Sequence, residues 1–359
     1  MQNQITVIIT IRNRESSRIE NQVNSIRKYG ANPTIHVVDY GSDENYKNQY
    51  EKLCAKLNIK FTHMYAEGLP WNKCRAINYG VRQATTPFIV TSDVDMIYTS
   101  NPFQWCLDNF EEKCIYHIPT YWLPKSANFK KAQAAGIGNS GGFVFSHIQA
   151  FIDTNGYDER FVYWGKEDAD FPIRLRTLGY KQIWLPETEH KLYHQWHPTL
   201  KDTVYRPTTA FHNSFRFNFE NLITPKINQN YGENLELKDR PILNYIKNEK
   251  PDIFYIQQSK LHHGDIAKNL VSYIKHNNFV KIDIGKRIFT NINLNPFLKK
   301  IISYGIRILG LECIDYLNIN FDLLYEAIQI LKNKKQIIDY YFDDKLENIY
   351  ILSRHEGSI

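Results

Sequence analysis

Cysteine is scarce in this chain, and the few cysteines present follow no metal-binding or disulfide pattern. There are 5 Cys among 359 residues, an odd number, and no CxxC pair occurs. Disulfide frameworks and zinc ribbons both need paired cysteines at short, regular spacings. The cysteine content therefore argues against both classes and favours a reducing compartment.

Long apolar runs are also missing. No stretch of the sequence approaches the roughly 18 uninterrupted apolar residues that suggest a membrane-spanning helix. The start of the chain, MQNQITVIITIRNRE, lacks the basic segment, apolar centre and small-residue cleavage site of a secretory signal. We therefore expect a cytoplasmic protein that is neither exported nor membrane-spanning.

The excess of charge is small. The 44 Lys and Arg residues against 38 Asp and Glu give a net charge of +6, and no stripe of Lys and Arg or nucleic-acid motif accompanies it. We therefore expect no nucleic-acid partner. The composition, 43% hydrophobic and 23% charged, is that of a globular chain, and the length fits one large domain with an appendage or two domains.

Short apolar runs rich in β-branched residues alternate with helix-compatible segments in the N-terminal part of the chain. Strands are predicted over Ile5 to Ile11, Thr34 to Val38 and Pro87 to Ile97, with helices near residues 45–57 and 71–84. Such alternation predicts an α/β fold with a mostly parallel sheet flanked by helices. Ligands bind beyond the carboxyl ends of the strands in such sheets.

The composition changes beyond about Asn213, where Asn, Ile, Lys and Tyr become frequent and glycine becomes rare. We predict a first domain over residues 1–212 and a mainly helical region of unknown role over residues 213–359. In residues 297–311, Leu and Ile fall on one helical face and Lys and Arg on the other, with no acidic residue. This helix either lies on an anionic membrane surface or packs on a core like an ordinary amphipathic helix.

Several carboxylates and imidazoles stand at spacings that suit metal-dependent chemistry. Asp93 and Asp95 flank one residue at the end of a predicted strand, and Glu167 and Asp168 are adjacent. Paired anions need a cation, and their hard oxygens suit Mg²⁺ or Mn²⁺. Two histidines three apart, in His194-Gln195-Trp196-His197, favour Mn²⁺ over Mg²⁺ because imidazole is a softer ligand.

The motifs DVD, GGFVF, WGKED and HQWH, in that order, make this chain resemble the GT-A nucleotide-sugar glycosyltransferases. The resemblance is to family-2 enzymes whose second half is similar to the β-1,4-galactosyltransferase C-terminal region, including bacterial chondroitin-type polymerases. It covers Ile5 to Pro198. It implies a GT-A catalytic domain in residues 1–212 that transfers a hexose or N-acetylhexosamine, with inversion, from a UDP-sugar to a hydroxyl of a saccharide acceptor. The resemblance also implies a role in the synthesis of a surface polysaccharide or oligosaccharide. The acceptor could then be linked to a lipid at the inner face of the membrane, where the protein would bind peripherally.

The resemblance also implies a nucleotide-sugar site. Asp39 matches the carboxylate that hydrogen-bonds uracil, although many relatives read VDDGS where this chain reads Val38-Asp39-Tyr40-Gly41-Ser42. Arg75 and Asn78, three apart on one helical face, match a segment that lines the nucleotide. The complete implied donor site comprises Thr10, Arg12, Asp39, Arg75, Asn78, Asp93, Asn139, Gly141 and Gly142.

For the reaction itself, the resemblance implies that Asp168 is the catalytic base, with Glu167 beside it at the catalytic centre. Glu167 and Trp164 would also bind the acceptor sugar, by hydrogen bonds and by stacking. The implied metal ligands are Asp95, His194 and His197, holding Mn²⁺ with Mg²⁺ as the alternative. A structural role for Glu167 and Asp168, at the start of a helix near Ala169, is compatible with catalysis because carboxylates favour helix N-termini.

Asn139 stands where animal galactosyltransferases carry Tyr beside the C2 position of the sugar. The smaller side chain leaves room for an N-acetyl group, which favours UDP-GalNAc or UDP-GlcNAc over the alternatives UDP-galactose, UDP-glucose and UDP-glucuronate. A nucleotidyltransferase would need a glycine- and lysine-rich loop where this chain has Arg12-Asn13-Arg14-Glu15. A non-catalytic sugar-binding subunit would be expected to lack Asp95, Asp168 or His197, and all three are present.

Overall fold

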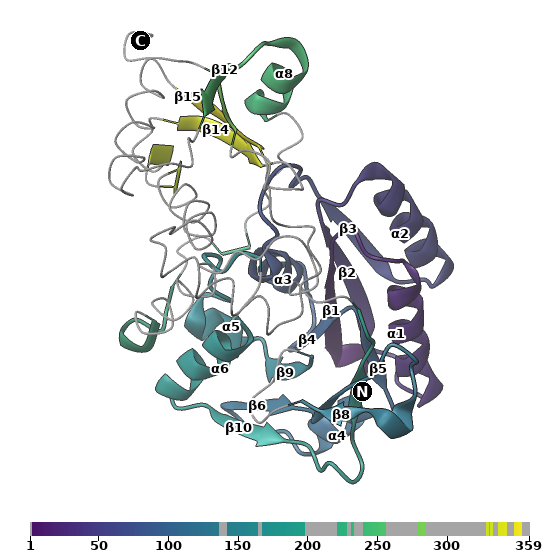
Figure 1. The fold of residues 1–359 in the computed structure, drawn as a ribbon. Helices are drawn as coiled ribbons and strands as arrows, with labels where there is room; N and C mark the ends of the chain where they lie inside the picture. The colour runs from purple at the N-terminus through teal and green to yellow at the C-terminus, as the bar shows by residue number, and fades with distance from the viewer. Residues whose placement is uncertain are drawn as a thin grey trace, which may run out of the picture. The chain divides into compact units, whose positions relative to one another are not determined.

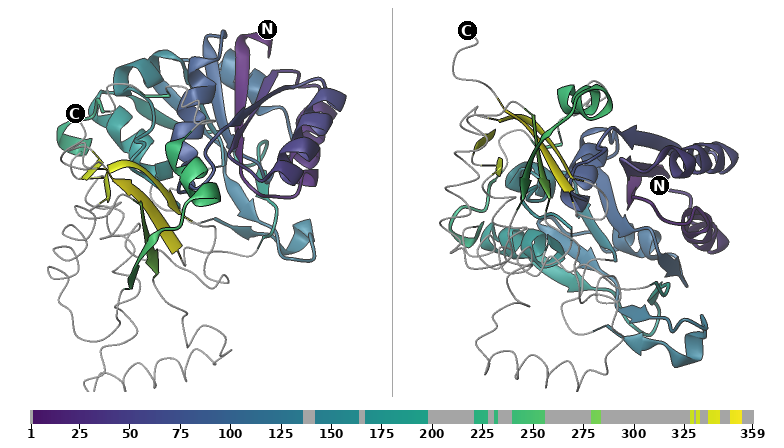
Figure 2. Two further views of the ribbon diagram at one scale, coloured as in Figure 1. Left: turned by 90° about the horizontal axis from the view of Figure 1, so that it is seen from above. Right: turned by 45° about the horizontal axis from the view of Figure 1, so that its top comes forward.

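The computed structural model describes residues 2–135, 142–163, 167–197, 221–227, 231–232, 240–255, 279–283, 328–329, 331–332, 337–342 and 348–353 (Figures 1 and 2). The chain divides into two compact units. The first comprises Met1–Glu67, Trp71–His197 and Phe211–Glu236, and the second comprises Gly68–Pro70, Pro198–Ala210 and Leu237–Ile359. Each unit is described by itself.

The first unit is built on a seven-stranded sheet in the order β10-β6-β9-β4-β1-β2-β3. Strands β4, β1, β2 and β3 are mutually parallel, whereas β9 runs antiparallel to both β4 and β6. The prediction of a mostly parallel sheet is therefore confirmed. The strands are β1 Ile5–Ile11, β2 Thr34–Tyr40, β3 Lys60–Met64, β4 Phe88–Asp93, β6 Cys114–His117, β9 Val144–His147 and β10 Lys181–Trp184.

Helices cover both faces of this sheet, and the alternation of side chains along β1 shows how (Figure 1). Val7 and Ile9 are fully buried in the cluster that includes residues of α1 and α2. Ile8 points the other way, because a Cβ added to Gly80 of α3 would lie 2.7 Å from its side chain. The helices are α1 Ser17–Lys28, α2 Glu44–Lys56, α3 Lys73–Arg82, α4 Pro102–Asp108, α5 Gln149–Thr154 and α6 Glu167–Thr177, with 3₁₀ turns at Gln2–Gln4 and Phe129–Lys131.

A second, four-stranded sheet takes up part of the predicted strand over Pro87 to Ile97. That strand ends at Asp93, the chain turns through Val94 and Asp95, and β5 then joins the second sheet. Its order is β5-β11-β7-β8, where β5 is Met96–Tyr98, β7 Thr120–Trp122, β8 Gln133–Ala134 and β11 Leu192–His194. The turn separates the surroundings of the two aspartates, which a continuous strand would have placed on the same side.

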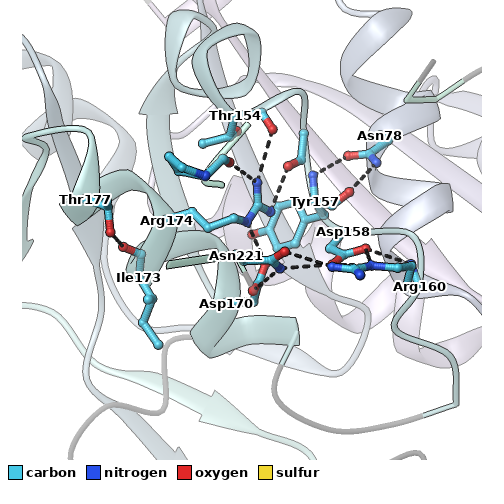
Figure 3. A network of polar contacts seen from close by, with 12 residues as sticks. Asn78, Thr154, Tyr157, Asp158, Arg160, Asp170, Ile173, Arg174, Thr177 and Asn221 are labelled. Atoms are coloured by element: carbon cyan, nitrogen blue, oxygen red, sulfur yellow. Dashed lines mark hydrogen bonds and ion pairs between the residues drawn. The ribbon is translucent and has the colours of Figure 1, made fainter. Parts of the chain in front are cut away.

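Helix α6 is held by a buried polar network centred on Arg174 (Figure 3). The completely buried guanidinium of Arg174 donates to Asp170 Oδ2 over 2.7 Å and to the carbonyl oxygens of Thr154 and Gly156. Asn221 donates to Asp170 Oδ1 over 2.7 Å and to Asp158 Oδ2 over 2.9 Å. Segments far apart in the sequence are thus tied to the helix whose first residues are Glu167 and Asp168.

The second unit contains a sheet that the prediction of a mainly helical region over residues 213–359 did not include. Its order is β12-β13-β15-β14, with β12 Asp252–Tyr255, β13 Phe279–Asp283, β14 Ile337–Phe342 and β15 Asn348–Ser353. Helix α8, Pro241–Asn248, packs against β14 and β15. The strands are short, and β13 pairs with β15 from 65 positions away, a pairing that leaves little local signal in the sequence. The adjacent strands β14 and β15 form a local antiparallel pair, which the prediction did not identify.

None of the described helices is both long enough and apolar enough to span a bilayer. The amphipathic segment 297–311 lies outside the described residues.

We predict that Asp170→Ala destabilises the first unit strongly. It leaves the buried guanidinium of Arg174 without its carboxylate, and breaking a buried ion pair in this way costs about 3–5 kcal/mol. Urea unfolding should show the loss. Arg176→Ala removes an exposed cation from the same helix and should change the free energy of unfolding by no more than about 0.5 kcal/mol. Equal effects of the two variants would contradict the role given to the network.

Candidate active site

The carboxyl ends of three neighbouring strands meet at one edge of the large sheet. In the parallel register, Thr10 of β1 lies beside Asp93 of β4, and Ile11 lies beside Asp39 of β2. Strands aligned in this way bring residues far apart in the sequence to one edge. The structure therefore brings Thr10, Asp39 and Asp93 to the edge where the sequence predicts a ligand site.

Lys73, in the first turn of α3, joins two of the predicted acidic groups. Its Nζ lies 2.6 Å from Asp93 Oδ1 and 3.6 Å from Glu167 Oε1, and all three side chains are largely buried. Burial alone would lower the pKa of Lys73, but the surrounding carboxylates outweigh it and hold that pKa well above its usual value. Lys73 is therefore a permanent cation between β4 and α6.

Asp168, the second residue of α6, has the electrostatic character of a general base. Burial, followed by the neighbouring charge of Glu167, raises the pKa of Asp168 to about 6, while Lys73 acts in the opposite direction. A carboxyl group whose pKa lies close to neutrality accepts a proton more readily than an ordinary one. The start of α6 also carries the adjacent carboxylate of Glu167, as predicted from the sequence.

Asp95, His194 and His197 come together as a candidate metal site. Asp95 Oδ1 lies 3.3 Å from His194 Nε2, and Asp95 Oδ2 lies 3.3 Å from His197 Nε2. One ligand atom from each residue falls within 4.8 Å of the other two. The antiparallel pairing of β11 with β5, continued by a hydrogen bond from Gln195 N to Asp95 O over 2.8 Å, brings the histidines to the aspartate.

The donor atoms of this cluster fit a divalent ion. Asp95 Oδ1 and His194 Nδ1 are buried and accept or donate no hydrogen bond within the part of the chain that the structure describes. A carboxylate with two imidazoles is a ligand set for Mn²⁺ and related metals, and three protein ligands leave coordination positions for a substrate. The charged groups around the cluster favour a cation, because their formal charge is 1 − 4 = −3. The positive charge is that of Lys73, and the four negative charges are those of Asp93, Asp95, Glu167 and Asp168.

Asp39 has its oxygens occupied by neighbouring protein groups. It is completely buried, its Oδ1 accepts from the Ser42 hydroxyl over 2.5 Å, and its Oδ2 lies 2.6 Å from His63 Nδ1. The uracil contact of Asp39 stays a prediction. The observed contacts give the carboxylate the additional task of fixing the turn after β2.

Arg75 and Asn78 both contact Glu159, which the sequence analysis did not single out. Arg75 Nε donates to Glu159 Oε2 over 2.9 Å, and Asn78 Nδ2 donates to Glu159 Oε1 over 2.9 Å. Asn78 is completely buried and also exchanges hydrogen bonds with the backbone of Tyr157. In this arrangement Asn78 joins α3 to the segment before α6, and a ligand has no access to its side chain.

The remaining predicted residues are placed unevenly. Gly142 is packed tightly, because an added Cβ would lie 2.9 Å from Met96 Sδ and 3.1 Å from Leu192 Cδ2, which explains its lack of a side chain. Arg12, just beyond β1, is half-buried and makes contacts of its own. Asn139, Gly141 and Trp164 lie outside the described residues.

Lys73 is the main functional residue that the sequence analysis missed. From the sequence, a metal ion alone was expected to neutralise the paired carboxylates of Asp93 and Asp95. A cationic side chain of the protein can neutralise part of the same charge. Lys73 directly follows Asn72, whose side chain caps α3 by accepting from Arg75 N. An Asn before a helical segment is a sequence signal for a helix start, and it would have placed Lys73 in the first turn of α3. Its pairing with Asp93 could not be read from the sequence, because 20 positions separate the two residues.

We predict that Lys73→Met lowers the melting temperature more at pH 8 than at pH 5. Without the ammonium, Asp93, Glu167 and Asp168 face one another, and protonation at low pH relieves their repulsion. Thermal unfolding across this pH range measures the difference. Lys52→Met, at an exposed position on α2, is the control and should give the same small change at both pH values. A pH-independent loss for Lys73→Met would contradict the electrostatic role.

Comparison with known proteins gives a family match over part of the chain. Residues 6–163 match the model described as glycosyl transferase family 2. No curated protein matches the chain. Solved structures with similar folds include GalNAc-T7 with UDP, GalNAc and Mn²⁺, at 14% identity and a TM-score of 0.47, covering 60% of this chain and 47% of that one.

Two structures of Drosophila β1,4-galactosyltransferase 7 are also similar. One is the catalytic domain with xylobiose, at 17% identity and a TM-score of 0.36, covering 50% of this chain and 63% of that one. The other is a mutant with manganese, UDP-Gal and xylobiose, at 15% identity and a TM-score of 0.36, covering 53% of this chain and 69% of that one. The chain spans about half the length of GalNAc-T7. These likenesses carry no argument about function. Residues 6–163 are thus similar to glycosyl transferase family 2, and they lie in a unit built on a mostly parallel sheet flanked by helices.

Proposed function

We propose that this chain is a glycosyltransferase, and that it moves an N-acetylhexosamine or a hexose from a UDP-sugar to a hydroxyl of a saccharide acceptor, with inversion and with a divalent metal. The observation that carries the proposal is the grouping of a metal-type cluster, Asp95 with His194 and His197, close to the carboxylates around Lys73. Asp95 and His194 are near enough to Asp93 to influence its ionisation, and Asp93 in turn influences that of Asp168.

Asp168 is the base in this proposal. Its carboxylate accepts the proton of the acceptor hydroxyl as the oxygen attacks the anomeric carbon from the side opposite UDP. The bond from the anomeric carbon to the diphosphate oxygen breaks, and the configuration inverts. Because Lys73 and Glu167 are held together by charge, the start of α6 stays fixed beside β4 while the proton moves.

Asp95, His194 and His197 would hold the metal ion. When bound, a divalent ion supplies Lewis-acid neutralisation of the charge that grows on the departing diphosphate. The imidazole ligands favour Mn²⁺, with Mg²⁺ as the alternative.

The identity of the sugar is proposed from the sequence alone. Asn139, in place of a larger aromatic residue, supports GalNAc or GlcNAc over galactose, glucose and glucuronate. A role in surface polysaccharide or oligosaccharide synthesis, and a lipid-linked acceptor that segment 297–311 would approach at a membrane, belong to the same proposal.

We predict that Asp168→Asn reduces sugar transfer by at least about 100-fold while UDP binding is retained. The assay screens UDP-sugars with Mn²⁺ for UDP release. In the unaltered enzyme, kcat/KM should fall as the pH drops below about 6, where Asp168 takes up its proton.

The same variant separates catalysis from folding. A pKa raised in the folded state means that ionised Asp168 reduces stability as the pH rises through about 6, so Asp168→Asn should be at least as stable as the unaltered protein at pH 8. Asp108→Asn, on the exposed end of α4, is the control and should leave transfer unchanged. Full activity of Asp168→Asn would remove Asp168 as the base.

We predict that Asp95→Asn, His194→Ala and His197→Ala each weaken Mn²⁺ binding by at least about tenfold, since even residues behind metal ligands cost this much. Electron paramagnetic resonance of free Mn²⁺ measures the affinity without an assay of turnover. His147→Ala, at the end of β9, is the control and should bind Mn²⁺ normally. Unchanged affinity in all three ligand variants would refute the metal site.

A further inference from the structure

The loop that joins β7 to β8 carries an unusual set of exposed side chains. Residues 123–132 contain three lysines and one phenylalanine, and an exposed tryptophan stands at each of the two adjoining strand ends, β7 and β11. All six of these aromatic and lysine side chains are exposed; Trp122 is 40% exposed, Phe129 47% and Trp196 41%. We call the set the loop patch; it consists of Trp122, Lys125, Phe129, Lys130, Lys131 and Trp196.

The loop patch is continuous with the candidate metal site. The ring of Trp122 lies against that of His194, with centroids 4.3 Å apart, and Leu123 N donates to His194 O over 2.9 Å. On the other strand end, Lys125 Nζ lies 5.2 Å from the ring centre of Trp196, between the two histidines in the sequence. A ligand on the patch would therefore also lie beside the metal ligands.

The patch is positively charged and has no acidic residue of its own. Between Glu112 and Asp153 the sequence contains no Asp or Glu, and neither does the stretch from His190 to His197. Lys125, Lys130 and Lys131 thus project from a loop without neighbouring carboxylates in its own sequence. Each ammonium offers three donors for an anionic oxygen.

The aromatic rings indicate what kind of anion fits. A large exposed aromatic face packs against flat, weakly polar surfaces, and the C–H face of a pyranose ring is such a surface. The patch combines two tryptophans and a phenylalanine with three lysines. This combination suits a saccharide that carries carboxylate or sulfate groups, because the rings contact the sugar faces and the lysines contact the charges.

We propose that the loop patch binds the acceptor, and that the acceptor is a glycan chain bearing carboxylate or sulfate groups. The inference deepens the proposed function, because it gives the substrate class of the same site. A nucleic acid is disfavoured because the described lysines of the patch end at one short loop, without the continuous stripe that follows a phosphate backbone.

Binding to defined glycans tests the proposal without any donor or turnover. The first probe is the hyaluronan hexasaccharide, which alternates glucuronate with N-acetylglucosamine, and the second is the same hexasaccharide with its carboxylates reduced to alcohols. Isothermal titration calorimetry of the full chain should show at least about tenfold tighter binding of the charged hexasaccharide, the ratio that corresponds to about 1.4 kcal/mol.

Substitutions locate the binding surface. Lys125→Gln, Lys130→Gln and Lys131→Gln together should remove at least about tenfold of the affinity for the charged hexasaccharide and little of that for the neutral one. Trp122→Ala with Trp196→Ala should weaken both. The matched control, Lys28→Gln with Lys52→Gln and Lys60→Gln, removes the same charge from exposed positions on α1, α2 and β3, and should bind like the unaltered protein.

Three results would overturn the proposal. They are equal affinities for the charged and neutral hexasaccharides, the same loss of affinity in the control triple variant, or equally tight, lysine-dependent binding of a thymidine hexanucleotide, which would mean a general anion surface. Failure of UDP release with every UDP-sugar would refute the proposed function and leave these binding results standing. Conversely, active transfer to neutral acceptors without glycan binding at the patch would refute this inference alone.

Discussion

The contact of one buried ammonium with two carboxylates organises the active-site region. Asp93 closes β4, Glu167 opens α6, and Lys73 of α3 lies between them at 2.6 and 3.6 Å. Without that cation, the carboxylates at this sheet edge would repel one another in a buried place, where charges are weakly screened. The cation permits a high density of acid groups while leaving their net charge negative, and a metal ion in the proposed site would balance that charge. Asp95 Oδ1, which is buried beside His194 and makes no hydrogen bond among the described residues, belongs to the same arrangement.

The proposed base, Asp168, lies at the start of a helix that a second, separate network holds in place. Arg174 and Asp170 lie one turn apart on α6, and Asn221 joins them to the segment around Asp158 (Figure 3). This network holds the helix behind its first residues, Glu167 and Asp168. Positioning and chemistry are thereby divided between different residues of one short helix. The raised pKa of Asp168 results from its burial at the end of that helix.

The second sheet connects metal binding with the proposed acceptor surface. Pairing of β11 with β5 brings His194 to Asp95, and pairing of β11 with β7 places Trp122 beside His194. A single strand of three residues therefore contributes a metal ligand and supports an exposed aromatic side chain. Substitutions in β11 would affect both properties together, whereas the lysines of the loop 123–132 can be changed without touching the metal ligands.

The sequence by itself determined the alternating strands and helices over about the first hundred residues, because buried strands such as Ile5–Ile11 show continuous apolar runs and turns show their own residues. It also pointed to Asp95, Asp168 and the two histidines, through motifs with recognisable spacings. Lys73, Glu159 and Asn221 were not found, since their partners lie 20 to 94 positions away, and no local pattern records such a pairing. The break at Asp95, which separates it from Asp93, arises from β5 pairing with β11, and in the second unit β13 likewise pairs with the distant strand β15. Only the tertiary structure decided these features, because side chains that neutralise or orient a site are selected by proximity in space.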